Sequence, residues 1–321
     1  MPHRYRNHPA ARAFAGSALV AALLGACTTG SPAGTHASGA SSPTATAATA
    51  ATAATSSRPA SASVSSAKPR PRSVTVLGSG DVLIHPPLWQ QAHQDAGGKA
   101  GSGYDFGPMY ASIKPDVESA DLAICEMETP LAPPQGPFTG WPNFNAPPQV
   151  LTALKAVGYD SCTTASNHTI DEGYPGVVRT LDELDKAGLK HTGSARNAHE
   201  AATPLIITVG RSSATGAGVK IAQLAYSFDF NQIPIPRGKP WIANLTDVPK
   251  ILAAAHRLKQ AGADIVVLSM HWGTEYDHLA TSTQKQQARR LLASPDIDVI
   301  LGDHAHVVQP AEKINGKWVF Y

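Results

Sequence analysis

The sequence predicts an α/β domain with a mainly parallel sheet in the part of the chain that follows residue 72. Short apolar runs rich in β-branched residues recur along this part, and each has the length of a buried strand. Segments with apolar residues at helical spacing separate most of these runs. Strands that alternate with helices are typical of α/β domains with parallel sheets.

Five apolar runs predict strands, and four amphipathic segments predict helices. The predicted strands are residues 74–77, 121–125, 161–165, 264–270 and 297–301. The predicted helices are residues 147–157, 176–187, 248–260 and 282–292. Prolines begin the first of these helices, and Thr281 is placed to cap the last. Gly158, Gly188 and Gly262 lie where helices should end.

Residues 204–209 and 219–228 predict a pair of strands joined by a turn rich in Gly and Ser. The regular alternation breaks here, because no helix separates the two segments. A mixed sheet, or a second sheet packed on the first, would accommodate the pair. No repeat and no further shift in composition divides residues 73–321, which we therefore expect to form one domain.

The formal charge of +2 hides an uneven distribution of charged residues. Seven Lys and Arg residues precede the first acidic residue, Asp81, which leaves 19 basic against 24 acidic residues in the rest of the chain. A mildly acidic domain lacks the clustered positive charge that neutralises phosphates along a duplex. We therefore expect no nucleic-acid partner.

The first 27 residues have the pattern of a bacterial secretion signal. Three arginines precede an apolar run over residues 13–24, which is too short to span a bilayer as a stable helix. The sequence Leu24-Gly25-Ala26-Cys27 resembles the lipobox of bacterial lipoproteins, in which Cys27 would be acylated after cleavage before it. The alternative is an ordinary signal peptide with an incidental cysteine. We expect an extracytoplasmic protein that a lipid anchors to the cell membrane.

Residues 28–72 are dominated by Ala, Ser, Thr, Pro and Gly and include no aromatic or acidic residue. Such a segment cannot bury enough apolar surface to offset the entropy of ordering it. It predicts a disordered tether between the membrane and the folded domain. In that domain Cys125 and Cys162 lie in apolar runs, and we expect two buried thiols, with a disulfide between neighbouring strands as the alternative.

Side chains that can bind metals follow each of the five predicted strands. In chain order they are Asp81 and His85; Glu126 and Glu128; Asn167, His168 and Asp171; His271 and Glu275; His304 and His306. Each group alone is explained by a helix cap, a turn or a solvated charge. The carboxyl ends of parallel strands meet at one edge of a sheet, however, so the five groups together predict a metal or catalytic centre.

The candidate ligands are carboxylates, an amide and imidazoles, and none is a thiolate. This donor set suits Mn, Fe, Zn or Ni rather than a structural zinc bound by cysteines. More than four candidate ligands suit two divalent metal ions, which can clamp the attacking and leaving oxygens of a phosphoryl group. The sequence contains no P-loop, no Gly-x-Ser-x-Gly motif and no paired Cys motif. Phosphoester hydrolysis is therefore the expected reaction class.

The strand-end residues belong to five ordered motifs. These are Gly80-Asp81-Val82, Glu126-Met127-Glu128-Thr129-Pro130-Leu131, Ala165-Ser166-Asn167-His168-x-x-Asp171-x-Gly173, His271-Trp272-Gly273-x-Glu275-Tyr276 and Gly302-Asp303-His304-Ala305-His306-Val307. From about residue 73 onward, the chain resembles the CapA family of capsule and poly-γ-glutamate biosynthesis proteins. That family is similar to the calcineurin-like metallophosphatases. The resemblance implies a four-layer α/β/β/α sandwich with a two-metal site.

The resemblance also implies a role for each strand-end residue. Asp81 and His306 would hold one ion, Asn167, His271 and His304 would hold the other, and Glu128 would lie near both. His168 would be the catalytic acid that protonates the leaving group. Independently of the resemblance, we expect Asp171 to orient His168 or the loop, since metal sites depend on carboxylates behind their ligands. His85, Glu126 and Glu275 are second-tier candidates for the site.

This sequence departs from the family pattern at several positions. The family usually has Asn at the positions of Glu126 and Ser166, which alters the charge expected near the metals. The wider phosphatase pattern has a His two residues after the first Asp, where this chain has Leu83, and His85 follows two positions later. The family also typically continues beyond the position of Tyr321, so we expect the domain to be incomplete at its C-terminus.

Two functions from different classes fit these observations. The first is a metal-dependent hydrolase of the cell envelope that cleaves a phosphoester, or a bond in a polymer such as poly-γ-glutamate or a cell-wall glycan. The alternative is a non-catalytic component of a polymer synthesis and export complex that holds an anionic polymer. The acidic domain does not attract a polyanion by its own charge, so bound metal would have to supply that attraction.

Overall fold

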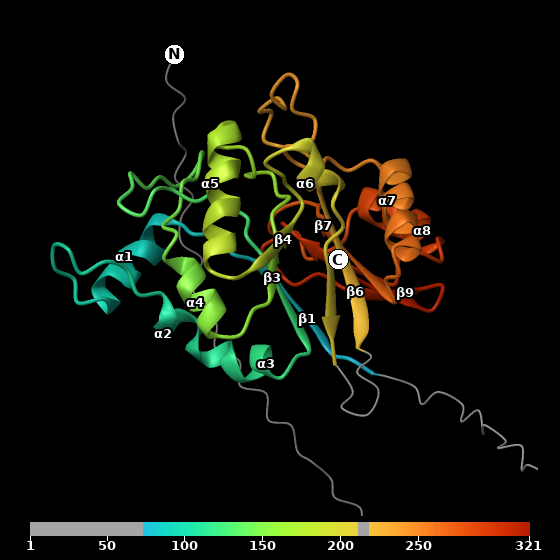
Figure 1. The fold of residues 1–321 in the computed structure, drawn as a ribbon, viewed down its shortest axis with the longest axis horizontal. Helices are drawn as coiled ribbons and strands as arrows, with labels where there is room; N and C mark the ends of the chain where they lie inside the picture. The colour runs from blue at the N-terminus through green and yellow to red at the C-terminus, as the bar shows by residue number, and fades with distance from the viewer. Residues whose placement is uncertain (1–72, 211–217) are drawn as a thin grey trace, which may run out of the picture. The chain divides into compact units, whose positions relative to one another are not determined.

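The computed structural model describes residues 73–210 and 218–321 (Figure 1). The predicted signal peptide, Cys27 and the predicted tether lie outside the described residues. Among the helices of the described ranges, none combines the length and the apolar character needed to cross a membrane.

The first sheet has four parallel strands in the order β1-β2-β3-β4. They are β1 (Val76–Asp81), β2 (Leu122–Glu126), β3 (Ser161–Thr163) and β4 (Lys190–Thr192). The first three correspond to predicted strands, whereas β4 is too short and too polar for its sequence to predict it. β1 extends past the predicted end at residue 77, since Gly78 lets the strand pass close to Leu301, whose Cδ1 would lie 2.6 Å from a Cβ at that position.

Helices cover the outer face of the first sheet. They are α1 (Pro86–Asp95), α2 (Gly107–Tyr110), the 3₁₀ turn η1 (Ala111–Ile113), α3 (Lys114–Glu118), α4 (Val150–Ala156) and α5 (Gly173–Lys186), with the short α6 (Ala198–Ala202) following β4. The two predicted helices of this half correspond to α4 and α5, and α5 begins three residues before its predicted start. The sequence does not predict α1 to α3, because α1 buries only Ala92 and α3 only Val117.

The second sheet has six strands in the order β5-β6-β7-β8-β10-β9. They are β5 (Ile206–Val209), β6 (Val219–Ser227), β7 (Ile265–His271), β8 (Val299–Asp303), β9 (Ala311–Ile314) and β10 (Lys317–Phe320). The central strands are parallel, and the two edge strands β5 and β9 are antiparallel to their neighbours. The predicted strand pair therefore belongs to a second, mixed sheet. Its helices are α7 (Val248–Gln260) and α8 (Ser282–Leu292), as predicted.

The two sheets pack face to face, with helices on both outer faces. Alternate residues of each strand point in opposite directions, so Leu122 and Ile124 of β2 meet Ile221 of β6 between the sheets. Ala123 and Cys125 of the same strand pack against the helices of the first sheet. A separate core joins α7 and α8 to the second sheet. This arrangement confirms the four-layer α/β/β/α sandwich (Figure 1).

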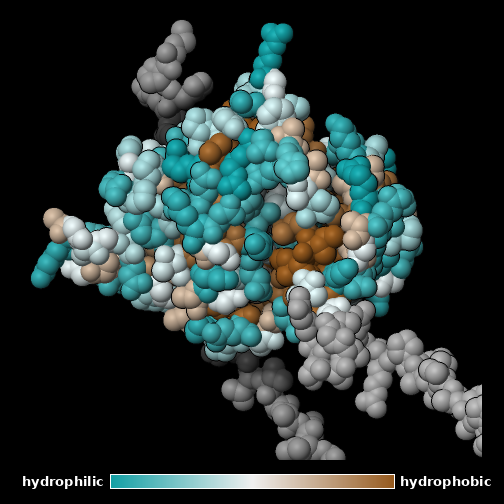
Figure 2. Space-filling model, viewed as in Figure 1, coloured by the Kyte–Doolittle hydropathy of each residue, from teal (hydrophilic) through white to brown (hydrophobic). Residues whose placement is uncertain are grey.

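Hydrophilic residues cover most of the face seen in Figure 2, and one apolar region lies over β5 and β6.

The helix ends agree with the sequence signals. The side chain of Thr281 accepts a hydrogen bond from the backbone N–H of Gln284 in a capping box at the start of α8. Gly158 and Gly188 have positive φ angles of 109° and 71° where α4 and α5 end.

The expectation of two free buried thiols is wrong, because Cys125 and Cys162 form a disulfide. The two residues are directly paired in register between β2 and β3, and their Cα atoms lie 4.4 Å apart. The sequence shows two apolar runs but not their register, so it does not reveal that the cysteines are neighbours.

Candidate metal centre

The candidate metal centre lies where the carboxyl ends of the two sheets meet. β1 ends at Asp81 and β2 at Glu126 in the first sheet, while β7 ends at His271 in the second. The backbone N–H of His304, in the loop after β8, donates to the carboxylate of Asp81 at 3.1 Å. Residues from opposite ends of the sequence thus come together because the two sheets share this edge.

The imidazole of His271 is fully buried at the middle of the centre. Its Nδ1 lies 3.1 Å from Oε1 of Glu126 and 3.7 Å from Oδ1 of Asp81. Its Nε2 lies 2.9 Å from Oδ1 of Asn167 and 4.0 Å from Oε1 of Glu128. Burial lowers the pKa of His271 well below its usual value, so the ring is neutral and has a lone pair to offer a cation.

Asp81 lies against two histidines, one at the end of β7 and one in the loop after β8. Nδ1 of His306 lies 2.9 Å from Oδ2 of Asp81. Burial works to raise the pKa of Asp81, but the hydrogen bond from His306 outweighs it and keeps this pKa below its usual value. The same hydrogen bond raises the pKa of His306. Asp81 is therefore the ionised carboxylate of the centre.

Three further buried carboxyl groups surround this pair. Burial raises the pKa values of Glu126, Glu128 and Asp303 well above their usual range, and the charges of neighbouring acids raise them further. The salt bridges of the described residues include none between these groups and a Lys or Arg. Unpaired buried carboxylates are costly, so the chain itself provides too little positive charge at this place.

Several buried oxygen and nitrogen atoms of side chains in the centre have no hydrogen-bond partner among the described residues. They are Oε2 of Glu126, both carboxylate oxygens of Glu128 and Nδ1 of His304. Nδ1 of His271 also makes no hydrogen bond, although it lies 3.1 Å from Oε1 of Glu126. Native proteins satisfy nearly all buried polar atoms, so atoms left over in one cluster indicate a missing partner. Oxygen and imidazole nitrogen atoms are the ligands that first-row divalent metals prefer, so these residues fit such ions.

Two sets of residues place ligand atoms within 4.8 Å of one another and share Glu128. One set is Asp81, Glu128 and His306, and the other is Glu128, His271 and His304. Asn167 joins the second set through its contact with His271. These are the sets that the family resemblance assigns to two ions, and their role as metal ligands stays a prediction.

His168 lies beside the centre with its ring held by a buried carboxylate. Its Nδ1 lies 2.7 Å from Oδ2 of Asp171, whose side chain is fully buried. The same oxygen accepts a hydrogen bond of 2.8 Å from the backbone N–H of Phe144. Nε2 is the second nitrogen of this ring, and the side-chain amide nitrogen of Asn231 lies 3.5 Å from it. This geometry is compatible with the predicted acid role of His168.

The structure also brings Asn231, which no motif of the sequence singles out, into the site. Its side-chain amide nitrogen lies 3.3 Å from Nδ1 of His168, and its Oδ1 accepts a hydrogen bond of 3.2 Å from Asn167. Asn231 has a φ of 51° and follows the strand predicted over residues 219–228. The rule that polar groups gather after strand ends could have found it.

The second-tier candidates divide into two kinds. Glu126 and Glu275 each belong to a group of potential metal ligands, Glu126 with Asp81 and His271, and Glu275 with His304 and His306. His85 belongs to no such group among the described residues, and its ring packs edge-on against Phe144 at 4.9 Å. His85 thus lines the approach to the centre.

Ser166, where the family usually has Asn, ties two loops of the centre together. Its hydroxyl donates to the backbone carbonyl of Glu128 at 2.6 Å. The departure from the family pattern therefore places a short hydrogen-bonding side chain behind the shared carboxylate.

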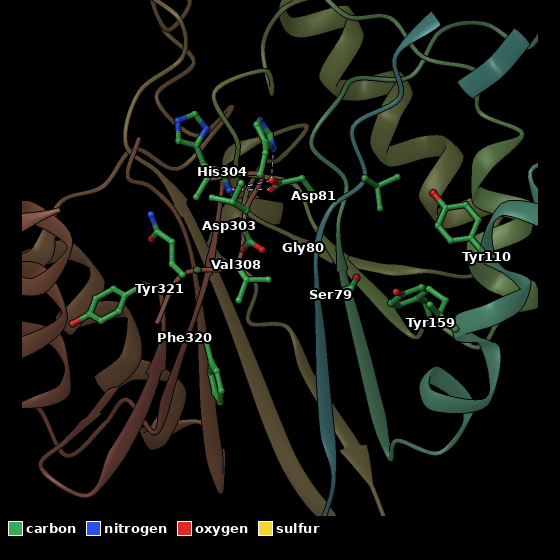
Figure 3. A pocket seen from close by; sticks show the side chains of 17 residues that line it. Ser79, Gly80, Asp81, Tyr110, Tyr159, Asp303, His304, Val308, Phe320 and Tyr321 are labelled. Carbon is green, nitrogen blue, oxygen red and sulfur yellow. Dashed lines mark hydrogen bonds and ion pairs between the residues drawn. The ribbon is translucent and has the colours of Figure 1, made fainter. Parts of the chain in front are cut away.

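Two hollows open beside the centre. A cavity of about 730 Å³ extends from Asp81 and His304 toward Phe320 on one side and toward Tyr110 and Tyr159 on the other (Figure 3). A cleft of about 510 Å³ lies on the side of His168 and His306. A small substrate can therefore approach the candidate ligands and His168 from the cleft.

The fold and the site define the class of two-sheet α/β/β/α proteins with a candidate divalent metal centre at the carboxyl edge of both sheets. Within this class, residues 75–321 match the family described as bacterial capsule synthesis protein PGA_cap. The chain belongs to that family.

The names of curated relatives agree with this family description. The PGA biosynthesis protein CapA of Bacillus subtilis is 32% identical over 171 residues, which cover 53% of this chain and 43% of the relative. The capsule biosynthesis protein CapA of Bacillus anthracis is 27% identical over 183 residues, which cover 56% of this chain and 42% of the relative. The chain thus matches less than half the length of these relatives. Among solved structures, the calcineurin-like phosphoesterase YfkN of Bacillus subtilis aligns at 18% identity and a TM-score of 0.45, over 76% of this chain and 75% of that one.

Proposed function

We propose that this protein is a metal-dependent phosphoester hydrolase of the cell envelope that acts in the production of capsule, poly-γ-glutamate or a related polymer. Membership of the capsule synthesis family supports the polymer context. One observation carries the chemistry: unpaired oxygen and nitrogen ligands, buried at the meeting point of two sheets, lie beside a histidine held by a carboxylate. Such an arrangement serves hydrolysis better than it serves stability.

Two divalent ions, Mn, Fe or Zn, would be held by Asp81, Glu128 and His306 on one side and by Asn167, His271 and His304 on the other. When bound, such ions activate water and neutralise charge on a phosphoryl group. The chain's own part is proton transfer and orientation. His168 gives a proton to the ester oxygen as its bond to phosphorus breaks, and Asp171 stabilises the positive ring before the transfer. The side-chain amide nitrogen of Asn231 lies near both nitrogens of the His168 ring and restricts its orientation.

The proposed location is the outer face of the cell membrane, with Cys27 acylated and residues 28–72 as the tether. The order of basic residues, apolar run and small residues before Cys27 supports this proposal. Labelling cells with an alkyne analogue of palmitate should mark the chain, and Cys27→Ser should abolish the label. A label that persists in Cys27→Ser would exclude Cys27 as the lipidation site.

Metal analysis of the purified full chain tests the proposed centre. We expect about two equivalents of Mn, Fe or Zn per chain by mass spectrometry. His304→Ala should lower the metal content, whereas His278→Ala, which changes an exposed histidine outside the centre, should not. Chains without metal after reconstitution would contradict the proposal.

Hydrolysis of p-nitrophenyl phosphate by the loaded chain distinguishes the enzyme from the alternative role. That alternative is a non-catalytic component that holds an anionic polymer, and one relative in Mycobacterium tuberculosis has the name probable polyglutamine synthesis accessory protein. Bound metal with no hydrolysis of any phosphoester would favour the accessory role. Hydrolysis that His304→Ala removes together with the metal would favour the enzyme.

A further inference from the structure

Two exposed aromatic side chains lie at the cleft above the candidate centre. Trp141 is 78% exposed and Tyr276 is 71% exposed. Both line the cleft of about 510 Å³ that also contains His168 and His306. Aromatic walls around a few polar groups are typical of small-molecule sites, and neither ring contributes to the core.

Trp141 lies on an ordered hairpin. The backbone N–H groups of Thr139 and Asn145 each donate to the carbonyl of the other residue, at 3.1 and 3.0 Å. The hydroxyl of Thr139 donates to the carbonyl of Asn143 at 2.8 Å, and the side chain of Asn145 donates to the carbonyl of Pro137 at 2.9 Å. The indole is therefore presented to solvent by a structured loop, which lowers the entropy lost when a ligand binds.

The same loop is joined to the proposed proton donor. Phe144 donates its backbone N–H to Asp171, the carboxylate that also holds His168, and its ring lies edge-on to His168 at 4.7 Å. Trp141 is three residues away from this anchor. A group that stacks on Trp141 would therefore be held at a fixed position relative to the reacting bond.

Tyr276 faces the cleft because of its backbone. Its φ of 63° is unfavourable for a bulky side chain, and its N–H donates to the carbonyl of Ala305 at 2.8 Å. Its ring centroid lies 5.8 Å from that of His306. The strained backbone thus keeps an aromatic ring in water beside a candidate ligand.

The charged residues that line the cleft indicate which class of ligand it can bind. No Lys or Arg is among the described residues that line it, and Glu275 adds a negative charge. Apart from its histidines, the described lining of the cleft offers no cation to a polyanion. The amides of Asn143 and Asn231 also line the cleft and offer hydrogen bonds to hydroxyl groups.

We propose that the cleft binds a carbohydrate ring and that the substrate is a sugar phosphoester. The C–H face of the ring stacks on Trp141 and Tyr276, and its hydroxyls bond to Asn143 and Asn231. In the reaction, water attacks phosphorus, the bond from phosphorus to the sugar oxygen breaks, and that oxygen takes the proton of His168. The reacting group rests on the proposed function, whereas sugar binding rests on the cleft alone.

The first test compares two phosphoesters with the full chain loaded with Mn²⁺. We measure kcat/KM for glucose 6-phosphate and for glycerol 3-phosphate, which has no ring. Trp141→Ala and Tyr276→Ala should each lower the ratio of the two values about tenfold, mainly through KM for the sugar ester. Trp318→Ala, which removes a half-exposed tryptophan outside the cleft, should leave the ratio unchanged. A ratio unaffected by both cleft variants would overturn the proposal.

The second test needs no catalysis. The indole N–H resonance of Trp141, assigned by its loss in Trp141→Phe, is followed in the metal-free full chain during titration with N-acetylchitotetraose and, separately, with adenosine. A shift with the tetrasaccharide alone supports a carbohydrate site, even if no phosphoester is hydrolysed. A shift with adenosine alone would identify a site for bases and overturn the proposal. If the chain hydrolyses a phosphoester but the Trp141 resonance does not shift with the tetrasaccharide, the carbohydrate site is excluded and the proposed function stands.

Discussion

Two clusters of charged residues in this molecule differ in where their positive charge comes from. In the first, Arg196 makes ion pairs with three carboxylates: Asp182 and Asp185 at 2.7 Å and Glu200 at 2.5 Å. In the second, at the candidate metal centre, the carboxylates outnumber their partners, and the ion pairs of that centre come, within the described residues, from histidines alone.

The difference separates a structural cluster from a functional one. The Arg196 cluster is complete within the chain, so it links α5 to the segment before α6 without any ligand. The candidate centre is more deeply buried and has fewer partners, which no stability argument explains. A deficit of positive charge in a buried cluster is therefore better evidence for an absent cation than the number of acids is.

Removing the proposed proton donor should have the largest effect. His168→Asn leaves every candidate ligand in place, so metal content should match that of the unsubstituted chain. The value of kcat for a phosphoester should fall about a hundredfold to ten-thousandfold, since general acid catalysis contributes on that scale. Steady-state kinetics and metal analysis on the same samples check this. Unchanged kcat at full metal content would show that His168 is not the acid.

Removing the disulfide should have the next largest effect, on the free energy of unfolding. The bond joins β2 and β3, the strands that lead to the candidate centre. Replacing both residues, Cys125→Ala and Cys162→Ala, should lower the free energy of unfolding by about 4 kcal/mol, because the bond closes a loop with a sequence separation of 37. Urea denaturation measures the loss. Iodoacetamide applied to the denatured, unreduced chain should modify neither cysteine, and labelling of both would contradict the bond.

Breaking the complete cluster should have a smaller effect than either change above. Arg196→Met keeps much of the aliphatic stem and leaves three carboxylates without their cation. We expect a loss of about 1–2 kcal/mol in the free energy of unfolding, because the cluster is partly exposed and water screens its charges. Metal content and phosphoester hydrolysis should not change. A loss of metal in this variant would show that the two clusters are coupled.

The pH dependence of the Arg196 cluster gives the smallest effect. Burial favours the neutral acids, but the hydrogen bonds from Arg196 outweigh it and hold the pKa values of Asp185 and Glu200 below their usual values of 3.8 and 4.5. The folded state then binds fewer protons than the unfolded state, so this stability is present above those values and lost as pH falls below them. Thermal melts from pH 6 to pH 3 should show a shallower decline for Arg196→Met. Parallel curves would contradict the assignment.

The fold was predictable to the extent that its elements bury continuous apolar faces. α7 and α8 have the predicted bounds because their buried residues recur at helical spacing and side chains cap their first turns. β4 has only three residues, none of them apolar, and its place in the sheet depends on pairing with β3. Such an element is defined by its neighbours, which a single sequence does not show.

The site was predictable as a set of strand ends but not as a geometry. Spacing singled out Asp81, Glu128 and His271 as candidate ligands. It could not show that His271 contacts acids through one ring nitrogen and Asn167 through the other, because that depends on how two sheets pack. Asn231 was missed since it lies in a loop without a recognised motif.

The division of the candidate ligands between two sheets has a mechanical consequence. Asp81 and Glu128 belong to the first sheet or to a loop that follows one of its strands, whereas His271 ends β7 of the second sheet and His304 follows β8. An ion held by both groups would link the two sheets, so the free energy of binding it would also stabilise the packing of one sheet on the other. A chelator should then let the layers part at this edge while the hydrogen bonds within each sheet persist. Amide hydrogen exchange measured with and without the chelator would reveal this. The chelator should accelerate exchange in the loops after β1 and β8 more than in the middle of β7.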